Sequence, residues 1–381
     1  MLAVLLAAPA LGQTPAAAPT SLLTAGHMDP RWSAALDAAL ETPPAFDAGA
    51  LYLPLRGGRL VAVELTTGET RWSRDRVSDA RPATGDGLVF VAGSGTLAAL
   101  DAVSGDVRWE TAVATRVVAP LYWDTGWLIV SVEGGDLLAL RASDGELLWR
   151  QPLGAPLSAL PAPALDRLYL GLTDRRVVAV DLATGAPIWT REMEGVATGL
   201  LALDEQLIVG SSARAIYSFS LRTARQRWRW RLGAGVLGAP VANESRVFFA
   251  TLDNTVRAIE RSNGHLAWRQ GLPSRPAGAP LLIDGHVLVP LLSTEMRGYD
   301  AARGRQAFLV TAAGEAGASP HVRPDARATG ARLITITLDG RVQAFGPRIE
   351  PMPVPLDVLP GVPVPGEAPP PPPAQGQTPS S

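Results

Sequence analysis

The chain of 381 residues contains no cysteine, no lysine and four histidines. Without cysteine, this sequence cannot form disulfides, thiolate zinc sites, Cys-ligated iron–sulfur clusters or a lipidated cysteine. Without lysine, it cannot provide a Schiff-base lysine or a P-loop lysine. The histidines, His27, His265, His286 and His321, lie far apart and form no HExxH-type pair, so no histidine metal site is predicted.

Charge and hydropathy remove further classes. The 34 basic and 36 acidic residues leave a net charge of −2, so neither a strongly basic nucleic-acid binder nor a polybasic membrane binder is the default expectation. The apolar run Leu2–Leu11 is too short to span a bilayer, and no other stretch approaches 18 apolar residues. We therefore expect no transmembrane span.

The two ends of the chain differ from its middle. Residues 1–12 are predicted to be a signal peptide, although the positively charged leading region is missing, and residues 13–28 a disordered spacer. Residues 347–381 hold 13 prolines and are predicted to form a Pro-rich disordered tail. The mature protein is expected to be periplasmic or otherwise extracytoplasmic, without lipid on a cysteine.

A repeat of about forty residues fills the middle of the chain. An aromatic residue recurs every 37–40 residues, with a small residue ten positions before it. The aromatic column is Trp72, Trp109, Trp149, Trp189, Trp228, Trp268 and Phe308. The small column is Ala62, Ala99, Ala139, Ala179, Ser218, Ala258 and Gly298. Four positions before the aromatic lies a turn glycine in six units of seven, and Ala224 is the exception.

Each unit is predicted to contain four short strands. Between 160 and 189, strands are expected near 160–163, 168–172 and 177–180 and from 187 onward, with turns between them. The middle strands are apolar at successive positions, which is typical of sheets buried on both faces. The sequence therefore predicts an all-β fold, an eight-bladed β-propeller of four-stranded antiparallel blades.

The count of eight depends on the last unit. It begins at 333–336 and continues at 341–345, but its aromatic would fall at Val354, inside the Pro-rich segment. Trp32 lies 40 residues before Trp72, so we expect an N-terminal strand near 30–36 to supply the outer strand and close the ring. The propeller then spans 29–346. The alternative is a seven-bladed ring with a loose N-terminus.

The unit at 168–189 resembles the PQQ-type β-propeller repeat, and the resemblance covers nearly the whole predicted ring. One branch of that family, the quinoprotein alcohol dehydrogenases, holds pyrroloquinoline quinone (PQQ) and calcium. The other includes the non-enzymatic outer-membrane assembly propeller (BamB-like). The short loops and the absence of cysteine favour the second branch. The resemblance then implies an exported scaffold that mediates protein–protein interactions in envelope assembly.

Under this interpretation the protein is not an enzyme. We expect no catalytic, cofactor-binding or metal-binding residues, no nucleic-acid partner, and a monomer that binds other proteins. One alternative is a PQQ- and calcium-dependent quinoprotein dehydrogenase, for which the insertion after Phe308 offers Glu315, His321 and Asp325. The other is a carbohydrate-binding or sensor propeller with a Trp-rich rim.

Two groups of residues are candidates for partner contacts. Strand alternation would place Arg225, Arg227, Arg229 and Arg231 on one face, and Gln226, Trp228 and Trp230 on the other. A basic strip edged by Trp230 could bind an acidic partner, or it could be a solvated outer strand. Trp123 and Trp127 lie outside the aromatic column and could form a contact on one rim, or pack locally.

Overall fold

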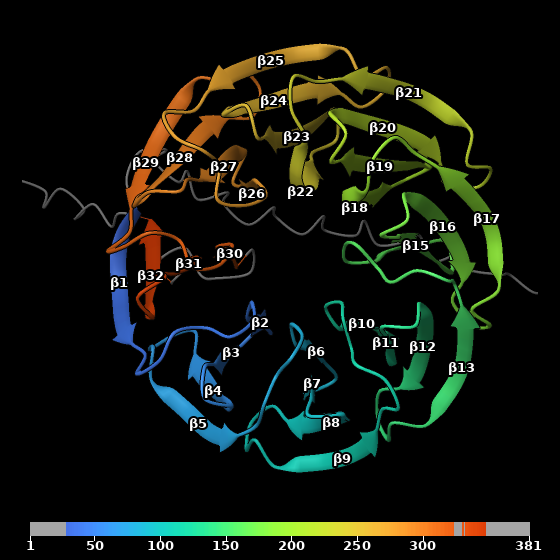
Figure 1. The fold of residues 1–381 in the computed structure, drawn as a ribbon. Helices are drawn as coiled ribbons and strands as arrows, with labels where there is room; N and C mark the ends of the chain where they lie inside the picture. The colour runs from blue at the N-terminus through green and yellow to red at the C-terminus, as the bar shows by residue number, and fades with distance from the viewer. Residues whose placement is uncertain (1–27, 324–329, 331, 348–381) are drawn as a thin grey trace, which may run out of the picture. The chain divides into compact units, whose positions relative to one another are not determined.

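The computed structural model describes residues 28–323, 330 and 332–347, and every regular element in these ranges is a β-strand. The strands form eight four-stranded sheets arranged as the blades of a ring (Figure 1). No helix that could cross a membrane occurs in this part of the chain. The predicted signal peptide, spacer and tail lie outside the described residues, except that Met28 and Pro347 belong to strands.

Seven blades are continuous in sequence, and each runs from an inner strand to an outer strand at the rim (Figure 1). The first three are β2 (Ala45–Phe46), β3 (Ala50–Leu55), β4 (Arg59–Glu64), β5 (Thr70–Asp75); β6 (Ala83–Gly85), β7 (Leu88–Gly93), β8 (Thr96–Asp101), β9 (Val107–Ala112); β10 (Tyr122–Asp124), β11 (Trp127–Ser131), β12 (Asp136–Arg141), β13 (Leu147–Pro152). The next two are β14 (Ala162–Ala164), β15 (Arg167–Gly171), β16 (Arg176–Asp181), β17 (Pro187–Glu192); β18 (Ala197–Leu203), β19 (Gln206–Ser211), β20 (Ala215–Ser220), β21 (Gln226–Arg231). The last two are β22 (Val236–Ala242), β23 (Arg246–Thr251), β24 (Thr255–Glu260), β25 (Leu266–Gly271); β26 (Leu281–Ile283), β27 (His286–Pro290), β28 (Glu295–Asp300), β29 (Gln306–Thr311).

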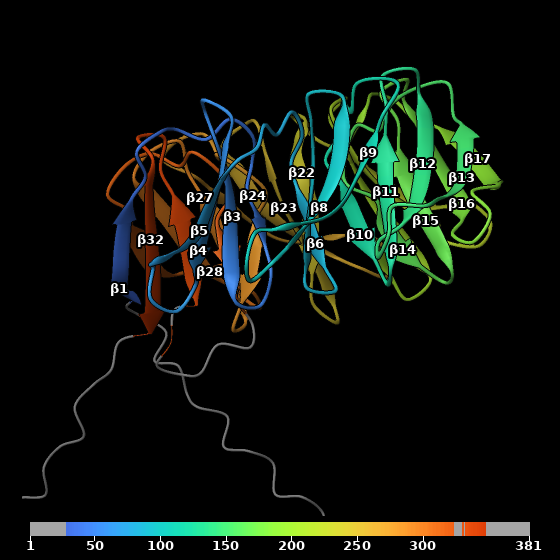
Figure 2. The same cartoon turned by 90° about the horizontal axis from the view of Figure 1, so that it is seen from below.

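The eighth sheet joins the two ends of the ring, and we call it the closing blade. It contains β30 (His321–Val322), β31 (Leu333–Ile336) and β32 (Arg341–Pro347), and its outer strand is β1 (Met28–Ala35). The β1–β32 ladder is antiparallel from Met28 opposite Pro347 to Ala35 opposite Arg341. Figure 2 shows these two strands side by side. The predicted eight-bladed ring with N-terminal closure is confirmed, and the seven-bladed alternative is wrong.

The aromatic and small columns meet as cross-strand partners in all eight blades. Trp72 lies opposite Ala62, and Trp32 lies opposite Ala344 in the closing blade. The other pairs are Trp109–Ala99, Trp149–Ala139, Trp189–Ala179, Trp228–Ser218, Trp268–Ala258 and Phe308–Gly298. A large ring opposite a small side chain fits the close spacing of neighbouring strands.

The hydrophobic core lies between neighbouring blades rather than at the centre of the ring. One cluster joins Leu51 and Val61 of the first blade to Ile334 and Val342 of the closing blade, all nearly fully buried. Such middle strands bury both faces, which explains why their sequences are apolar at successive positions. The ring is therefore held by eight similar seams.

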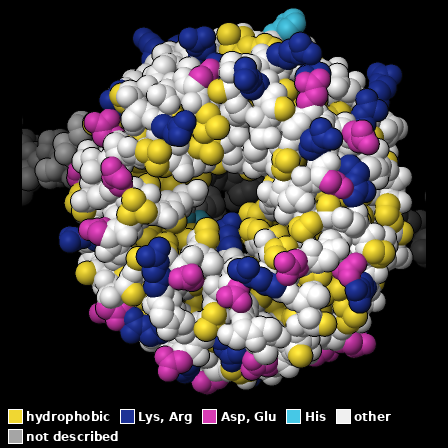
Figure 3. All heavy atoms as spheres, in the orientation of Figure 1, with side chains coloured by type: hydrophobic (Ala, Val, Ile, Leu, Met, Phe, Trp, Pro, Cys, Tyr) yellow, Lys and Arg dark blue, Asp and Glu magenta, His cyan; other side chains and the backbone are white. Residues whose placement is uncertain are grey.

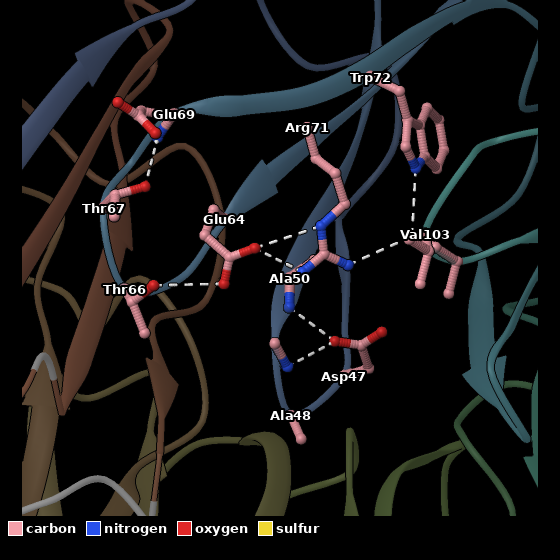
Figure 4. A network of polar contacts seen from close by, with 12 residues as sticks. Asp47, Ala48, Ala50, Glu64, Thr66, Thr67, Glu69, Arg71, Trp72 and Val103 are labelled. Carbon is pink, nitrogen blue, oxygen red and sulfur yellow. Dashed lines mark hydrogen bonds and ion pairs between the residues drawn. The ribbon is translucent and has the colours of Figure 1, made fainter.

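The tryptophans also cross these seams by hydrogen bonds. The Trp72 indole Nε1 donates to the Ala102 carbonyl of the next blade at 3.1 Å, and Arg71 Nη1 donates to the same oxygen at 3.3 Å (Figure 4). Equivalent bonds of 2.9–3.2 Å join Trp32 to Leu65, Trp109 to Ala142, Trp149 to Leu182, Trp189 to Leu221, Trp228 to Arg261 and Trp268 to Ala301. We call this bond the indole clasp.

The turn glycines also lie at the seams between blades. Gly105 has a φ of +75°, as its turn requires, and a Cβ there would lie 2.6 Å from the indole of Trp72 in the preceding blade. In the same turn Asp101 accepts the backbone N–H groups of Val103 and Ser104. Glu64, at the same position of the first blade, accepts hydrogen bonds from the Thr66 hydroxyl and from the Arg71 guanidinium (Figure 4).

Candidate functional site

The arginine-rich segment lies on β21, the outer strand of its blade. Trp228 opposes Ser218 and Gln226 opposes Phe219, so Arg227 is an extra residue in a β-bulge. The bulge interrupts the two-residue alternation that would place all four arginines on one face. Arg225, Arg227 and Arg231 are nevertheless exposed, and they remain available to solvent along this rim.

Arg229 is held differently from its neighbours. Its guanidinium pairs with Glu194 and lies 5.2 Å from the centre of the Tyr217 ring. The Glu194 carboxylate raises the pKa of Arg229, so its charge is fixed. Trp230 packs edge-on against Phe249 of the next blade, with ring centres 6.3 Å apart. Arg229 and Trp230 therefore belong mainly to the scaffold.

Trp123 and Trp127 are both partly buried in inter-blade clusters. A Cβ on Gly85, in the neighbouring blade, would lie 2.0 Å from the Trp123 indole, so that ring lies flat against the Gly85 backbone. Trp127 starts β11 and packs in the cluster that contains Leu168. Both indoles are therefore packed within the ring, and a role for them in binding a partner stays a prediction.

The centre of the ring is hollow. Figure 3 shows the opening on one face, with acidic and basic side chains intermingled around it. A recess of about 500 Å³ is lined by small and apolar residues of successive inner strands and connectors, including Leu160, Thr198, Gly199, Gly238 and Ala279. Such a wall offers backbone groups and hydroxyls, but few charged side chains, to any occupant.

His321, on β30, stacks on Phe46 of β2 with ring centres 3.9 Å apart. Burial, together with the nearby Arg323 and Arg81, lowers the pKa of His321 to about 4. Arg323 donates to the Ala48 carbonyl at 3.1 Å. His321 is thus a neutral packing group that joins the closing blade to the first blade.

The insertion does not supply a calcium site within the described residues. Calcium requires several oxygen ligands, usually from carboxylates. No group of three or more His, Asp or Glu side chains that could hold a metal occurs within 28–323, 330 and 332–347. Glu315 is exposed in its loop, and Asp325 lies outside the described residues.

Comparison with known proteins identifies relatives of the whole ring. The family model of the outer membrane protein assembly factor BamB matches residues 28–116, 56–199 and 173–345. A protein of that name from Yersinia pestis is 24% identical over 279 residues, covering 65% of this chain and 70% of the relative. One from Burkholderia pseudomallei is 25% identical over 329 residues, covering 78% and 82%.

Solved structures share the fold. BamB from Moraxella catarrhalis superposes with a TM-score of 0.71 at 22% identity, covering 84% of this chain and all of that chain. A quinohemoprotein alcohol dehydrogenase from Pseudomonas putida superposes with a TM-score of 0.70 at 14% identity, covering 87% and 78%. At these identities the superpositions establish a shared architecture, which scaffolds and enzymes both use.

Proposed function

The chain belongs to the family of the outer membrane protein assembly factor BamB, and from this membership we propose that it is a non-catalytic scaffold of envelope assembly. It binds other outer-membrane assembly proteins and acts in the periplasm, as a monomer. The observation that carries this proposal is the family match, which extends over residues 28–345 and thus over all eight blades. Relatives at 24–25% identity carry the name of an assembly factor.

The construction of the ring supports a scaffold. Buried clusters fill the seams, and indole clasps such as Trp149–Leu182 lock them at regular intervals. A ring held this way presents its rim and loops as rigid surfaces, which limits the conformational entropy lost on binding. On the rim, Arg225, which precedes β21, and Arg227 and Arg231 of β21 offer exposed positive charge to an acidic partner. Arg227 also lies 3.9 Å from Glu205, which is itself exposed.

Capture of partners tests the function. The full chain is immobilised, and outer-membrane assembly proteins from envelope extracts of its native bacterium are identified and quantified. We expect their specific enrichment, and their absence would overturn the proposed function. Changing Arg225, Arg227 and Arg231 together to Ala should reduce capture at least fivefold. Arg269→Ala, at an exposed arginine of the next outer strand, is the matched control. If the triple variant captures as much partner as the wild type, these three arginines do not belong to the interface, and the proposed function still stands.

The same scaffold is proposed to act without PQQ. The described residues lack the carboxylate cluster that calcium would need beside the quinone. Titration of the purified chain with PQQ and Ca²⁺, followed by quinone absorbance and by the melting temperature, should show no saturable change. A saturable change with both readouts would favour the quinoprotein alternative instead.

A further inference from the structure

Most of the wall around the centre of the ring carries no charge. The recess of about 500 Å³ extends from Tyr122, at the start of β10, to Ser319, shortly before β30, and none of its described lining residues is charged. Leu160 and Leu237 supply apolar surface between these ends. The volume falls within the roughly 300–1,000 Å³ that is typical of sites for small molecules. This part of the wall therefore suits the apolar body of a ligand.

The rest of the wall carries basic groups. The inner strands β30, β2 and β6 follow one another around the opening (Figure 1). Arg81 lies two residues before β6, and its Nε donates to the carbonyl of Pro44, next to β2, at 3.1 Å. His321 begins β30 and stacks on Phe46 of β2. We call Arg81 and His321 the basic pair.

The basic pair borders the recess at both of its ends. The backbone N–H of Leu121 donates to the Arg81 carbonyl at 3.0 Å, and the next residue is Tyr122, which lines the recess. At the other end, the lining residue Ser319 precedes His321 by two positions. The uncharged wall and the basic pair therefore surround the channel together.

No carboxylate of the described residues neutralises the basic pair. Arg81 forms no ion pair there. Burial lowers the pKa of Arg81, while burial and two basic neighbours, Arg323 and Arg81, lower the pKa of His321. Only the Nε of Arg81 has a hydrogen-bond partner in this part of the chain, and its Nη groups are not sealed from solvent. A partly buried cation without a partner is costly, so an anion bound beside it is stabilised.

The acids on the same side of the ring lie farther from the channel. We call this side, at which the chain enters the inner strands, the entry face. Glu41 and Asp79 are exposed there, and their backbone N–H groups donate to Pro54 on β3 and Ala92 on β7, which are second strands. Glu315, in the connector to β30, bonds the turn after β31 in a similar way. The local charge at the inner strands is therefore positive on the entry face.

Acids are found at the other mouth of the channel. Asp86, Asp124 and Asp166 lie where the inner strands β6, β10 and β14 end. The basic pair lies where β6 and β30 begin. An anion is thus repelled at one mouth and attracted at the other, so it reaches the basic pair from the entry face.

We propose that the channel binds an amphiphilic anion, a small molecule with a carboxylate or phosphate head and an aliphatic body. The head accepts hydrogen bonds from the Nη groups of Arg81, whose planar guanidinium suits two oxygens at once, and from the neutral imidazole of His321. The body lies in the recess against Leu160 and Leu237, where burial of apolar area stabilises it. PQQ is polar around its whole perimeter, so most of its oxygens would face apolar side chains without hydrogen bonds.

Calorimetric titration of the full chain tests the site with four probes, all below the concentrations at which micelles form. Octanoate and octyl phosphate carry both head and body, octanol lacks the charge, and inorganic phosphate lacks the body. We expect saturable binding of at least one of the two amphiphilic anions, and the stronger one identifies the head group. Octanol and inorganic phosphate should each bind about tenfold or more weakly. The proposal is overturned if neither amphiphilic anion binds, or if octanol or inorganic phosphate binds equally well.

Two pairs of variants locate the bound anion. Arg81→Gln should weaken binding about tenfold or more, because a charged hydrogen-bonding partner is lost. Arg56→Gln, at an exposed arginine of the β3–β4 turn, is the matched control and should bind as the wild type does. Leu160 lines the recess and is 37% exposed, so Leu160→Glu introduces a repelling charge at a position that tolerates a polar side chain. Leu160→Gln has the same length without the charge and should lose much less affinity.

Circular dichroism and the melting temperature establish that each variant is folded, and the Leu160 pair tests the site without altering Arg81. Unchanged affinity in Arg81→Gln or in Leu160→Glu would place the anion elsewhere and overturn the proposal. An equal loss in Arg56→Gln would show that only the overall charge of the protein matters, which also overturns it. The titration contains this protein and the probe alone, so its failure leaves the assembly function untouched.

Discussion

The indole N–H of Trp32 donates to the carbonyl oxygen of Leu65 at 3.2 Å, and this bond joins the closing blade to the first continuous blade. Trp32 lies at the start of the described chain, and its strand pairs with the last one. The seam formed by the two ends of the ring therefore has the same chemistry as seams within the chain. Ring closure is as firmly bonded as any other blade contact.

Trp32→Ala should destabilise the ring as much as Trp149→Ala. Both side chains are partly buried, oppose an alanine and bond a carbonyl of the next blade. We expect each variant to lose about 3 kcal/mol of unfolding free energy, from lost packing and an orphaned carbonyl. Chemical denaturation measures both. A Trp32 variant with wild-type stability would show that closure contributes little.

Phe308 is the one member of the aromatic column that has no indole N–H. The structure of the next blade, the closing blade, explains why this position is not a tryptophan. In the other blades the indole bonds the turn between the third and outer strands of the next blade. In the closing blade the equivalent carbonyl is that of Pro347, three residues after Ala344, and it already accepts a hydrogen bond from Arg31. Phe308→Trp should therefore bury an unpaired donor and lose about 1–2 kcal/mol. A gain in the midpoint of denaturation would contradict this explanation.

Gly105→Ala should cost much more than Gly87→Ala. Both glycines have positive φ, +75° and +72°, so both variants pay the same backbone strain of about 1 kcal/mol. A Cβ at Gly105 also meets Trp72 at 2.6 Å, while nothing lies within 4 Å at Gly87. We expect a loss of about 3 kcal/mol at Gly105, since the indole must move. If thermal denaturation shows the same loss of stability for both variants, the indole of Trp72 can move aside without cost, and the explanation is wrong.

Ala224→Gly should stabilise the protein. Ala224 takes the place of the turn glycine and has a φ of +57°, a conformation that costs an L-residue about 1 kcal/mol. Glycine also increases the conformational entropy of the unfolded chain, which offsets part of this relief. We expect the free energy of unfolding to rise by about 0.5 kcal/mol. Ala183→Gly, in the preceding blade at a turn residue without positive φ, serves as the control and should be slightly destabilising.

His321 should make stability depend on pH below neutrality. The unfolded chain protonates a histidine near pH 6.5, whereas burial lowers the pKa of folded His321 to about 4. Between these values the unfolded chain binds more protons, so the unfolding free energy falls as the pH drops from 6.5 towards 4. A loss of about 3 kcal/mol is expected over this range, since each pKa unit corresponds to about 1.4 kcal/mol. His321→Phe keeps the stack on Phe46 and removes the titration. Plots of unfolding free energy against pH for the wild type and for His321→Phe should diverge below pH 6.5. Parallel plots would show that His321 does not cause the pH dependence.

Much of this architecture could be predicted from the sequence, because repeat spacing is preserved along the chain. The aromatic and small columns, such as Trp149 and Ala139, proved to be direct cross-strand partners. The position of Trp32, 40 residues before Trp72, was enough to predict ring closure. Such periods are visible in the sequence because every blade packs against its neighbours in the same way, so the same residue types recur at the same spacing.

Contacts across seams were harder to predict. Gly105 precedes Trp109 by four residues in sequence, yet its close neighbour is Trp72 of the preceding blade. The packing of Trp123 on Gly85 likewise depends on the assembled ring.

The pairing of β1 with β32 also has a kinetic consequence. Arg31 bonds the carbonyl of Pro347, a contact between residues 316 positions apart. Loop closure over such a distance carries a large entropic cost and makes this step slow. The ring cannot finish folding until nearly all of the propeller has been synthesised. Until then, the unpaired edges of β1 and of the last blade require protection from aggregation.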